Sequence, residues 1–144
     1  MKKLSQTMMM ILVLVTLGVS VAEAQTSGPK RVVAQIPFAF NAGRTSLPAG
    51  RYEITVVNPS SDRTVLQLRS VDGQASAMIL TNSVNTNPAD DAKLVFERYD
   101  DRYFFTTAQL AGESVSFAAL HSKAERKQMV AATGKKRVVV IRIG

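Results

Sequence analysis

The sequence predicts an all-β domain, a mostly antiparallel sandwich or small barrel of about seven strands, with one short C-terminal helix. Two observations carry this prediction. Apolar residues recur at every second position through most of the chain, and turn-forming residues separate these stretches. A helical signal, by contrast, occurs only close to the C-terminus.

Residues 1–24 are typical of a cleavable signal peptide. Two lysines precede an apolar stretch over 8–22, which is shorter than the about 20 residues that a membrane-spanning helix needs. Small residues at the end of the segment predict cleavage between Ala24 and Gln25. We therefore expect an exported protein, periplasmic or extracellular, whose residues 25–144 form a single β-rich domain without a membrane span.

The strands of this domain are predicted from alternating apolar residues, and the turns from Gly, Pro, Asn and Asp. Leu47–Gly50 and the pair Asp72-Gly73 are expected to be tight turns in which glycine tolerates a positive φ. Asp100-Asp101 is expected to close a second hairpin, and 82–92 to be a long polar loop. The predicted strands cover residues 32–40, 51–56, 66–68, 75–81, 93–99, 102–107 and 138–143.

One face of these strands is expected to form the core. The large apolar residues that we expect to share it are Phe38, Phe40, Tyr52, Ile54, Leu66, Leu68, Leu94 and Phe96. Aromatic residues of the second hairpin, which could stack on a sugar, are more simply explained by packing in and around this core.

The helix is predicted over 123–132. Ser122 and Glu125 have the spacing of a capping box, and Gly134 is expected to end the helix as its C-terminal cap. The last predicted strand, Val138–Ile143, is a continuous apolar run. It could pair within the domain, or it could serve as the donor or free edge of a strand-donating subunit in an envelope assembly.

Three motifs carry a resemblance to a known family. The chain has Ile-Pro-Phe-Ala-Phe over 36–40, Leu-Pro-Ala-Gly-Arg-Tyr over 47–52 and Lys-Leu-Val-Phe-Glu-Arg-Tyr over 93–99. In this order and spacing, they resemble a family of small exported bacterial proteins of unknown function. The resemblance implies export and a β-rich domain, and it brings no catalytic residue or cofactor.

Composition excludes several kinds of chemistry. The chain has no Cys, no Trp and a single His, His121, so thiol catalysis, disulfides and cysteine-based zinc sites are absent. Acidic residues at 90–91, 97 and 100–101 leave a carboxylate-dependent hydrolase as an alternative, although acids in loops are usually solvated turn formers. The polar loop lacks the order of a calcium-binding loop. We expect no catalytic residue, no cofactor and no metal ion.

The charge lies at the C-terminal end. Residues 25–122 contain nine basic and nine acidic side chains, whereas 123–144 contain seven basic side chains and Glu125 alone. Such a basic region favours anionic envelope components or an envelope protein as partners, and not nucleic acid. We therefore predict a non-enzymatic binding or envelope-structural module. Its expected anion-contact residues are Lys123, Arg126, Lys127, Lys135, Lys136 and Arg137.

Overall fold

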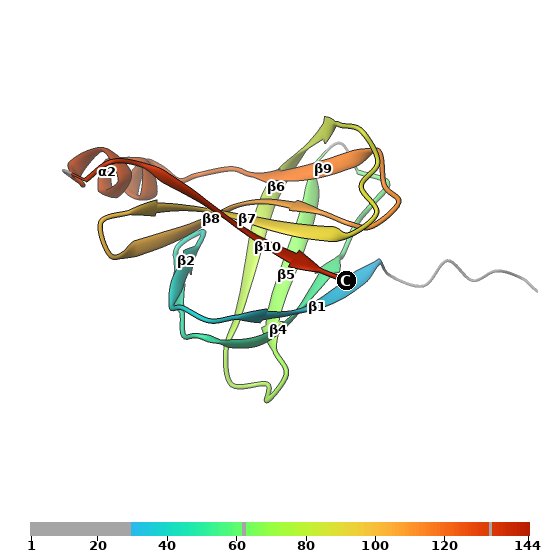
Figure 1. The fold of residues 1–144 in the computed structure, drawn as a ribbon, viewed down its shortest axis with the longest axis horizontal. Helices are drawn as coiled ribbons and strands as arrows, with labels where there is room; N and C mark the ends of the chain where they lie inside the picture. The colour runs from blue at the N-terminus through green and yellow to red at the C-terminus, as the bar shows by residue number, and fades with distance from the viewer. Residues whose placement is uncertain (1–29, 62, 133) are drawn as a thin grey trace, which may run out of the picture.

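The computed structural model describes residues 30–61, 63–132 and 134–144, so the signal peptide and its cleavage site at Ala24 and Gln25 lie outside the described residues. Figure 1 shows the described elements, which are ten strands and one helix. In chain order they are β1 (Arg31–Ile36), β2 (Phe40–Ala42), β3 (Thr45–Leu47), β4 (Gly50–Val56), β5 (Thr64–Ser70), β6 (Ser76–Asn85), β7 (Ala92–Tyr99), β8 (Arg102–Gln109), β9 (Val115–Ala119), α2 (Lys123–Ala131) and β10 (Arg137–Ile143).

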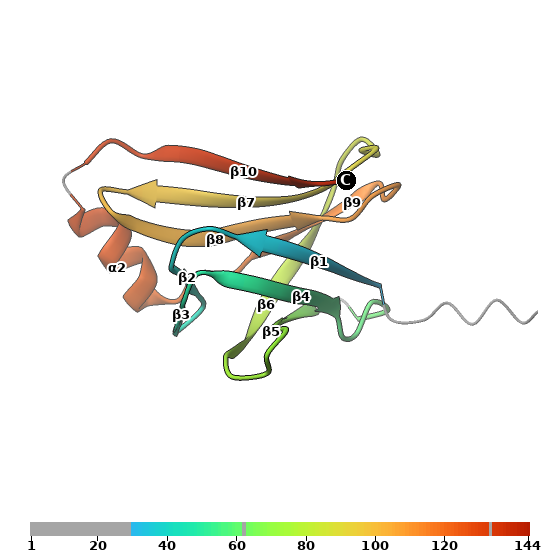
Figure 2. The ribbon, with the colours of Figure 1, turned by 60° about the horizontal axis from the view of Figure 1, so that its bottom comes forward.

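The strands form one continuous sheet that folds around the core. Along one path the order is β1-β4-β5-β6-β9-β8, and β8 then pairs with β7, which pairs with β10. These pairings are antiparallel, and the short β2–β3 hairpin adds to β8 through a parallel bridge between Asn41 and Phe104. Figure 2 shows β10, β7 and β8 above the strands β4, β5 and β6. The predicted all-β fold with a short C-terminal helix is confirmed.

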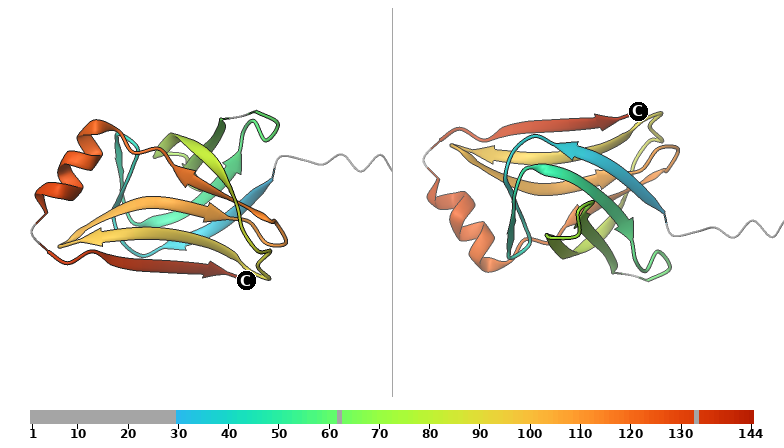
Figure 3. Two further views of the ribbon diagram at one scale, coloured as in Figure 1. Left: turned by 90° about the horizontal axis from the view of Figure 1, so that it is seen from above. Right: turned by 90° about the horizontal axis from the view of Figure 1, so that it is seen from below.

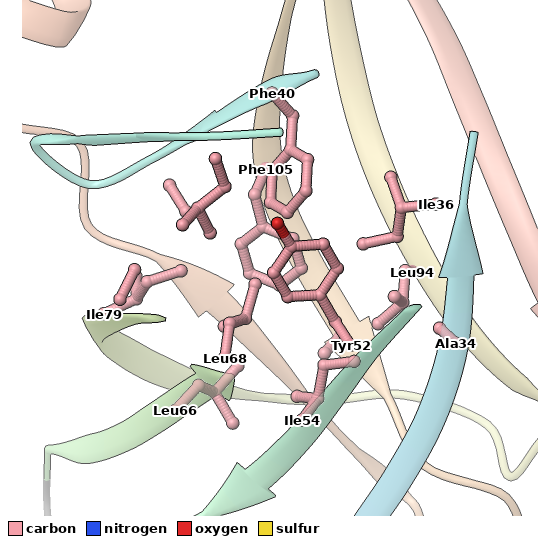
Figure 4. Close-up of a cluster of buried hydrophobic side chains, with 14 of the residues drawn as sticks. Ala34, Ile36, Phe40, Tyr52, Ile54, Leu66, Leu68, Ile79, Leu94 and Phe105 are labelled. Atoms are coloured by element: carbon pink, nitrogen blue, oxygen red, sulfur yellow. The ribbon is translucent and has the colours of Figure 1, made fainter. Parts of the chain in front are cut away.

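The core lies between these layers (Figure 4). Seven of the eight predicted core residues are fully buried in one cluster, and Phe38 packs against that cluster half-buried. Phe96 is central, with its ring 5.1 to 5.7 Å from the rings of Phe38, Phe40 and Phe105 in edge-to-face contacts. Within the described residues, no helix is long and apolar enough to span a membrane.

The number of strands was predicted too low. The expected strand over 32–40 ends at Ile36, since Pro37 offers no amide donor, and the chain then forms the β2–β3 hairpin around Gly43, whose φ is 62°. Strand β9 was not predicted, because its five residues alternate only weakly. Strand β6 also continues to Asn85, into the expected polar loop, because β9 pairs with its polar second half.

Two predictions about glycine are wrong, and one is confirmed. Gly73 has a φ of 77° in the β5–β6 turn, as expected. Gly50 is not among the glycines with positive φ and begins β4 instead. The helix ends at Ala131, one residue earlier than expected, and its cap residue is Ala132. Gly134 lies two residues beyond this cap residue, so it does not cap the helix.

Candidate functional site

Helix α2 is fixed at its start by the predicted capping box. The Glu125 amide donates to Ser122 Oγ over 3.2 Å, and the Ser122 amide donates to Glu125 Oε2 over 2.7 Å. Glu125 and Met129 are the buried residues of the helix, and they lie on one face because they are four positions apart. The opposite face, which carries basic side chains, is therefore exposed to solvent.

The β7–β8 hairpin is the second element that builds the candidate site. A bulge between Val95 and Phe96 shifts the register, so Phe105 lies opposite Phe96 in the core while Phe104 lies opposite Glu97 on the other face. Phe104 is nevertheless completely buried. Figure 3 shows α2 beside the closed end of this hairpin. The second face of the hairpin is therefore partly covered, which an alternating pattern alone does not predict.

Lys136 is not available as a free cation. Its Nζ lies 2.5 Å from Glu97 Oε1, and Tyr99 donates its phenolic proton to Glu97 Oε2 over 2.9 Å. Burial raises the pKa of Glu97, but the hydrogen bonds from Lys136 and Tyr99, with the charges of Lys136 and His121, outweigh it and hold that pKa below its ordinary value. The hydrogen bond and negative charge of Glu97 raise the pKa of Lys136 in turn.

Lys135 and Arg137, on either side of Lys136, line an open cleft with Arg98, Asp100 and Asp101. The cleft has a volume of about 440 Å³ and lies between the closed end of the hairpin and the segment that joins α2 to β10. Arg98 and Arg137 are directly opposite each other in the β7–β10 ladder. Two like charges in such a pair repel each other, so an anion bound near them would be favourable.

The β7–β8 turn already provides partners for the Arg98 guanidinium. Arg98 donates from Nε to the Asp100 carbonyl oxygen over 2.7 Å, and its Nη2 lies 3.4 Å from Asp101 Oδ1. Its guanidinium also lies 5.4 Å from the centre of the Tyr103 ring. Because Asp101 is fully exposed, this ion pair is weak. Lys135 and Arg137 are exposed and have no ion pair among the described residues, so they are the cations of this cleft that no acidic side chain holds.

The other predicted contact residues, Lys123, Arg126 and Lys127, lie on α2 and are all exposed. Lys123 and Lys127 are four positions apart, so they share the helix face opposite Glu125 and Met129. The predicted cluster is therefore divided into a helix part and a cleft part. Arg98, which belongs to the cleft, was not predicted, because only the strand register reveals that it faces Arg137.

His121 lies just before the helix. Its Nδ1 is buried without a hydrogen-bond partner, 3.7 Å from Glu125 Oε1. No group of three or more His, Cys, Asp or Glu side chains within the described residues is arranged to hold a metal ion.

The acidic residues considered for hydrolysis are spread along β7. Asp90 and Asp91 precede this strand, while Asp100 and Asp101 follow it, so the two pairs lie at opposite ends of an eight-residue strand. At about 3.4 Å per residue, such a strand separates them by more than 20 Å, farther than the carboxylates of a glycosidase. Glu97 lies between them and is held by Lys136 and Tyr99.

Comparison with known proteins adds no relative. No family model, no curated protein and no solved structure matches this chain. The geometry of the described residues is therefore the only guide to function, and the family resemblance of the three motifs stays a prediction.

Proposed function

We propose that this protein is an exported, non-enzymatic β-domain that binds anionic components of the bacterial envelope through one basic surface. We define the basic surface as the exposed cations of α2 and of the hairpin-end cleft, which are Lys123, Arg126, Lys127, Lys135 and Arg137. Lys136, which was predicted to belong to it, acts as a structural residue instead.

The observation that carries the proposal is the pair formed by Arg98 and Arg137. These two residues lie directly opposite each other in the β7–β10 ladder, and Lys135 lines the same cleft. Three cations and two carboxylates line this cleft, so its charge is net positive and favours phosphate or carboxylate groups. Arginine binds both groups in a bidentate manner. The helix cations extend the positive potential beyond the cleft, which favours a broad anionic surface over a small solute.

The test is co-sedimentation of residues 25–144 with anionic vesicles at increasing salt. Two variants test the two parts of the basic surface separately. Lys135→Gln/Arg137→Gln removes two cations from the cleft, and Lys123→Gln/Lys127→Gln removes two from the helix. Each variant should release the vesicles at lower salt than the unmodified protein, because fewer charges remain to be screened as the Debye length falls from about 10 Å at 0.1 M to about 3 Å at 1 M.

The matched control is Arg44→Gln/Arg63→Gln, which also removes two positive charges from exposed positions, outside the basic surface. It should bind almost as the unmodified protein does. If the control weakens binding as much as the other two variants, attraction depends on net charge and not on this surface. If the unmodified protein fails to bind at low salt, the proposal is wrong.

A further inference from the structure

Strand β10 has an edge that no strand of the described part of the chain covers. Within the described residues it pairs only with β7, over its whole length from Arg137 to Ile143 and without a bulge. The strand at the other end of the sheet, β1, approaches β10 but does not pair with it. Figure 3 shows β10 as the outermost strand of its layer in both views. Its second row of backbone amides and carbonyls is thus available to another strand.

The core also remains incompletely covered along this edge. Leu94 and Phe96 on β7 are fully buried, whereas Val139 and Ile141, which lie opposite them on β10, are only half-buried. On the outer face of β10, Val138 is 61% exposed and Val140 is 48% exposed. A further strand at this edge would bury apolar surface on both faces of β10, and its backbone would complete the ladder.

The charges at the two ends of β10 indicate what kind of strand fits. Arg137 lies opposite Arg98 at one end, and Arg142 lies opposite Lys93 at the other. Among the described residues, neither Arg142 nor Lys93 has an ion pair within 4.0 Å. A neighbouring strand with an acidic residue near each end would neutralise both like-charge pairs. These acidic residues would be five positions apart, with apolar residues between them.

A second copy of this chain would not supply the acidic residues that neutralise these like-charge pairs. If two β10 edges paired antiparallel, both arginines of each copy would lie in one ladder, and Lys135 of each copy would flank it. Like charges so close to one another destabilise the pairing. Complementary charge therefore favours a different protein as the source of the added strand.

We infer that the free edge of β10 is a docking site for an extended, acidic segment of a partner protein, which adds to the sheet as a further strand. The site is distinct from the basic surface proposed above, because it consists of the β10 backbone, the valines between Arg137 and Arg142, and these two arginines. The two sites share only Arg137, so they can be tested separately.

The experiment uses a synthetic peptide, Ser-Glu-Val-Val-Ile-Val-Glu-Ser, labelled with a fluorophore and added to residues 25–144. Its two glutamates are five positions apart, as the two arginines of β10 are. Fluorescence anisotropy should show binding of this peptide, and at least tenfold weaker binding when both glutamates are replaced by lysine. Hydrogen exchange should show slower exchange of the β10 amides in the complex, because the added strand protects them.

The deciding variant is Val140→Lys, which blocks the apolar part of the edge and keeps every cation in place. It should weaken peptide binding at least tenfold without weakening vesicle binding, because it adds a positive charge and removes none. Its matched control, Val84→Lys on β6, changes a valine that is 47% exposed, close to the 48% of Val140, and should bind the peptide normally. Circular dichroism checks that both variants fold, and Val138→Lys replaces Val140→Lys if the latter does not.

Three results would overturn the inference. Equal binding of the glutamate and lysine peptides would exclude charge recognition, and normal binding by Val140→Lys would place the peptide elsewhere. A dimer in size-exclusion chromatography with light scattering, converted to a monomer by Val140→Lys, would make a second copy the occupant of the edge. Loss of vesicle binding alone would contradict the proposed function and leave the β10 site standing.

Discussion

Lys136 Nζ lies 2.5 Å from Glu97 Oε1, and this ion pair joins the residue before β10 to the outer face of β7. Tyr99 holds the second carboxylate oxygen of Glu97. Because neighbouring residues of an extended segment point in opposite directions, the pair also directs Lys135 and Arg137 away from Glu97. Lys136 therefore has a structural role, whereas its neighbours Lys135 and Arg137 line the cleft.

We expect this ion pair to make stability depend on pH in a defined direction. The pKa of Glu97 is below its ordinary value of 4.5, so the charged carboxylate stabilises the fold at neutral pH, and this contribution disappears as pH falls from 4.5 through the folded-state pKa. The pKa of Lys136 is above its ordinary value of 10.5, so its contribution disappears as pH rises through the folded-state value.

The variant Glu97→Gln measures the acid side of this dependence. Lys136 is half-exposed, so we expect the variant to lose no more than about 1 kcal/mol in free energy of unfolding at pH 7. Urea unfolding at pH 7 and at pH 3 should show a smaller difference between variant and unmodified protein at the lower pH. A difference that stays constant with pH would show that Glu97 is not ionised in the fold.

Phe96 and Phe38 offer a graded test of the core. Phe96 is completely buried and its ring contacts three other aromatic rings, so Phe96→Ala should cost about 3 to 5 kcal/mol in urea unfolding. Phe38 is half-buried, although its ring stacks on Tyr103 with centroids 3.8 Å apart. Phe38→Ala should therefore cost clearly less. Equal losses would contradict the burial that separates the two rings.

Gly73 and Gly50 should respond differently to a side chain. At Gly73, a β-branched residue has to adopt a φ of 77°, so Gly73→Val should destabilise the fold by about 1 to 3 kcal/mol. At Gly50 the φ is not positive, and a Cβ atom would lie 3.6 Å from Tyr52 Cε2, an ordinary contact. Gly50→Ala should thus leave the melting temperature nearly unchanged. A large loss in Gly50→Ala would mean that β4 begins differently.

Cleavage of the signal peptide is a further prediction, and it concerns residues outside those that the structure describes. Small residues at Ala22 and Ala24 follow a short apolar stretch, so export should remove residues 1–24. The intact mass of protein recovered from an exporting cell should correspond to a chain that starts at Gln25. A chain that keeps residues 8–22 would instead be anchored to the membrane.

The core was predictable from the sequence, whereas the number of strands was not. Residues such as Tyr52 and Ile54 alternate on long strands, and alternation directly reports which side is buried. Strands β2 and β3 have only three residues each, too few to show a period, and they exist because they pair with each other and with β8. Their formation depends on long-range partners.

The candidate site was predictable only in its composition. The excess of basic residues after Ser122 can be counted in the sequence, but three facts come from register and packing alone. Lys136 meets Glu97, Arg137 lies opposite Arg98, and both strand ends of β10 carry like-charge pairs. Charge patterning in one dimension does not reveal which side chains neutralise each other in a folded sheet.

Gly134 provides the last prediction, because it lies very close to Asp100 in the β7–β8 turn. A Cβ atom at Gly134 would lie 1.8 Å from Asp100 Oδ1 and 3.2 Å from the Asp100 backbone nitrogen. The β7–β8 turn therefore packs directly against the segment between α2 and β10. Gly134→Ala requires the exposed Asp100 side chain to turn away and the Asp100 backbone nitrogen to move by a few tenths of an ångström. We therefore expect a cost of about 1 kcal/mol in free energy of unfolding, the low end of the range for overpacking.

A double-mutant cycle separates this clash from a general effect of alanine. Asp100 has a φ of 53°, which glycine adopts readily, so Asp100→Gly alone should be close to neutral. It also removes the carboxylate that meets the new Cβ atom. Asp100→Gly/Gly134→Ala should therefore recover most of the stability that Gly134→Ala loses. The remaining loss comes from the 3.2 Å approach of the Cβ atom to the Asp100 backbone nitrogen. If the two single effects simply add in thermal or urea unfolding, the turn and the segment before β10 are not in contact, and the hairpin-end cleft has a different shape.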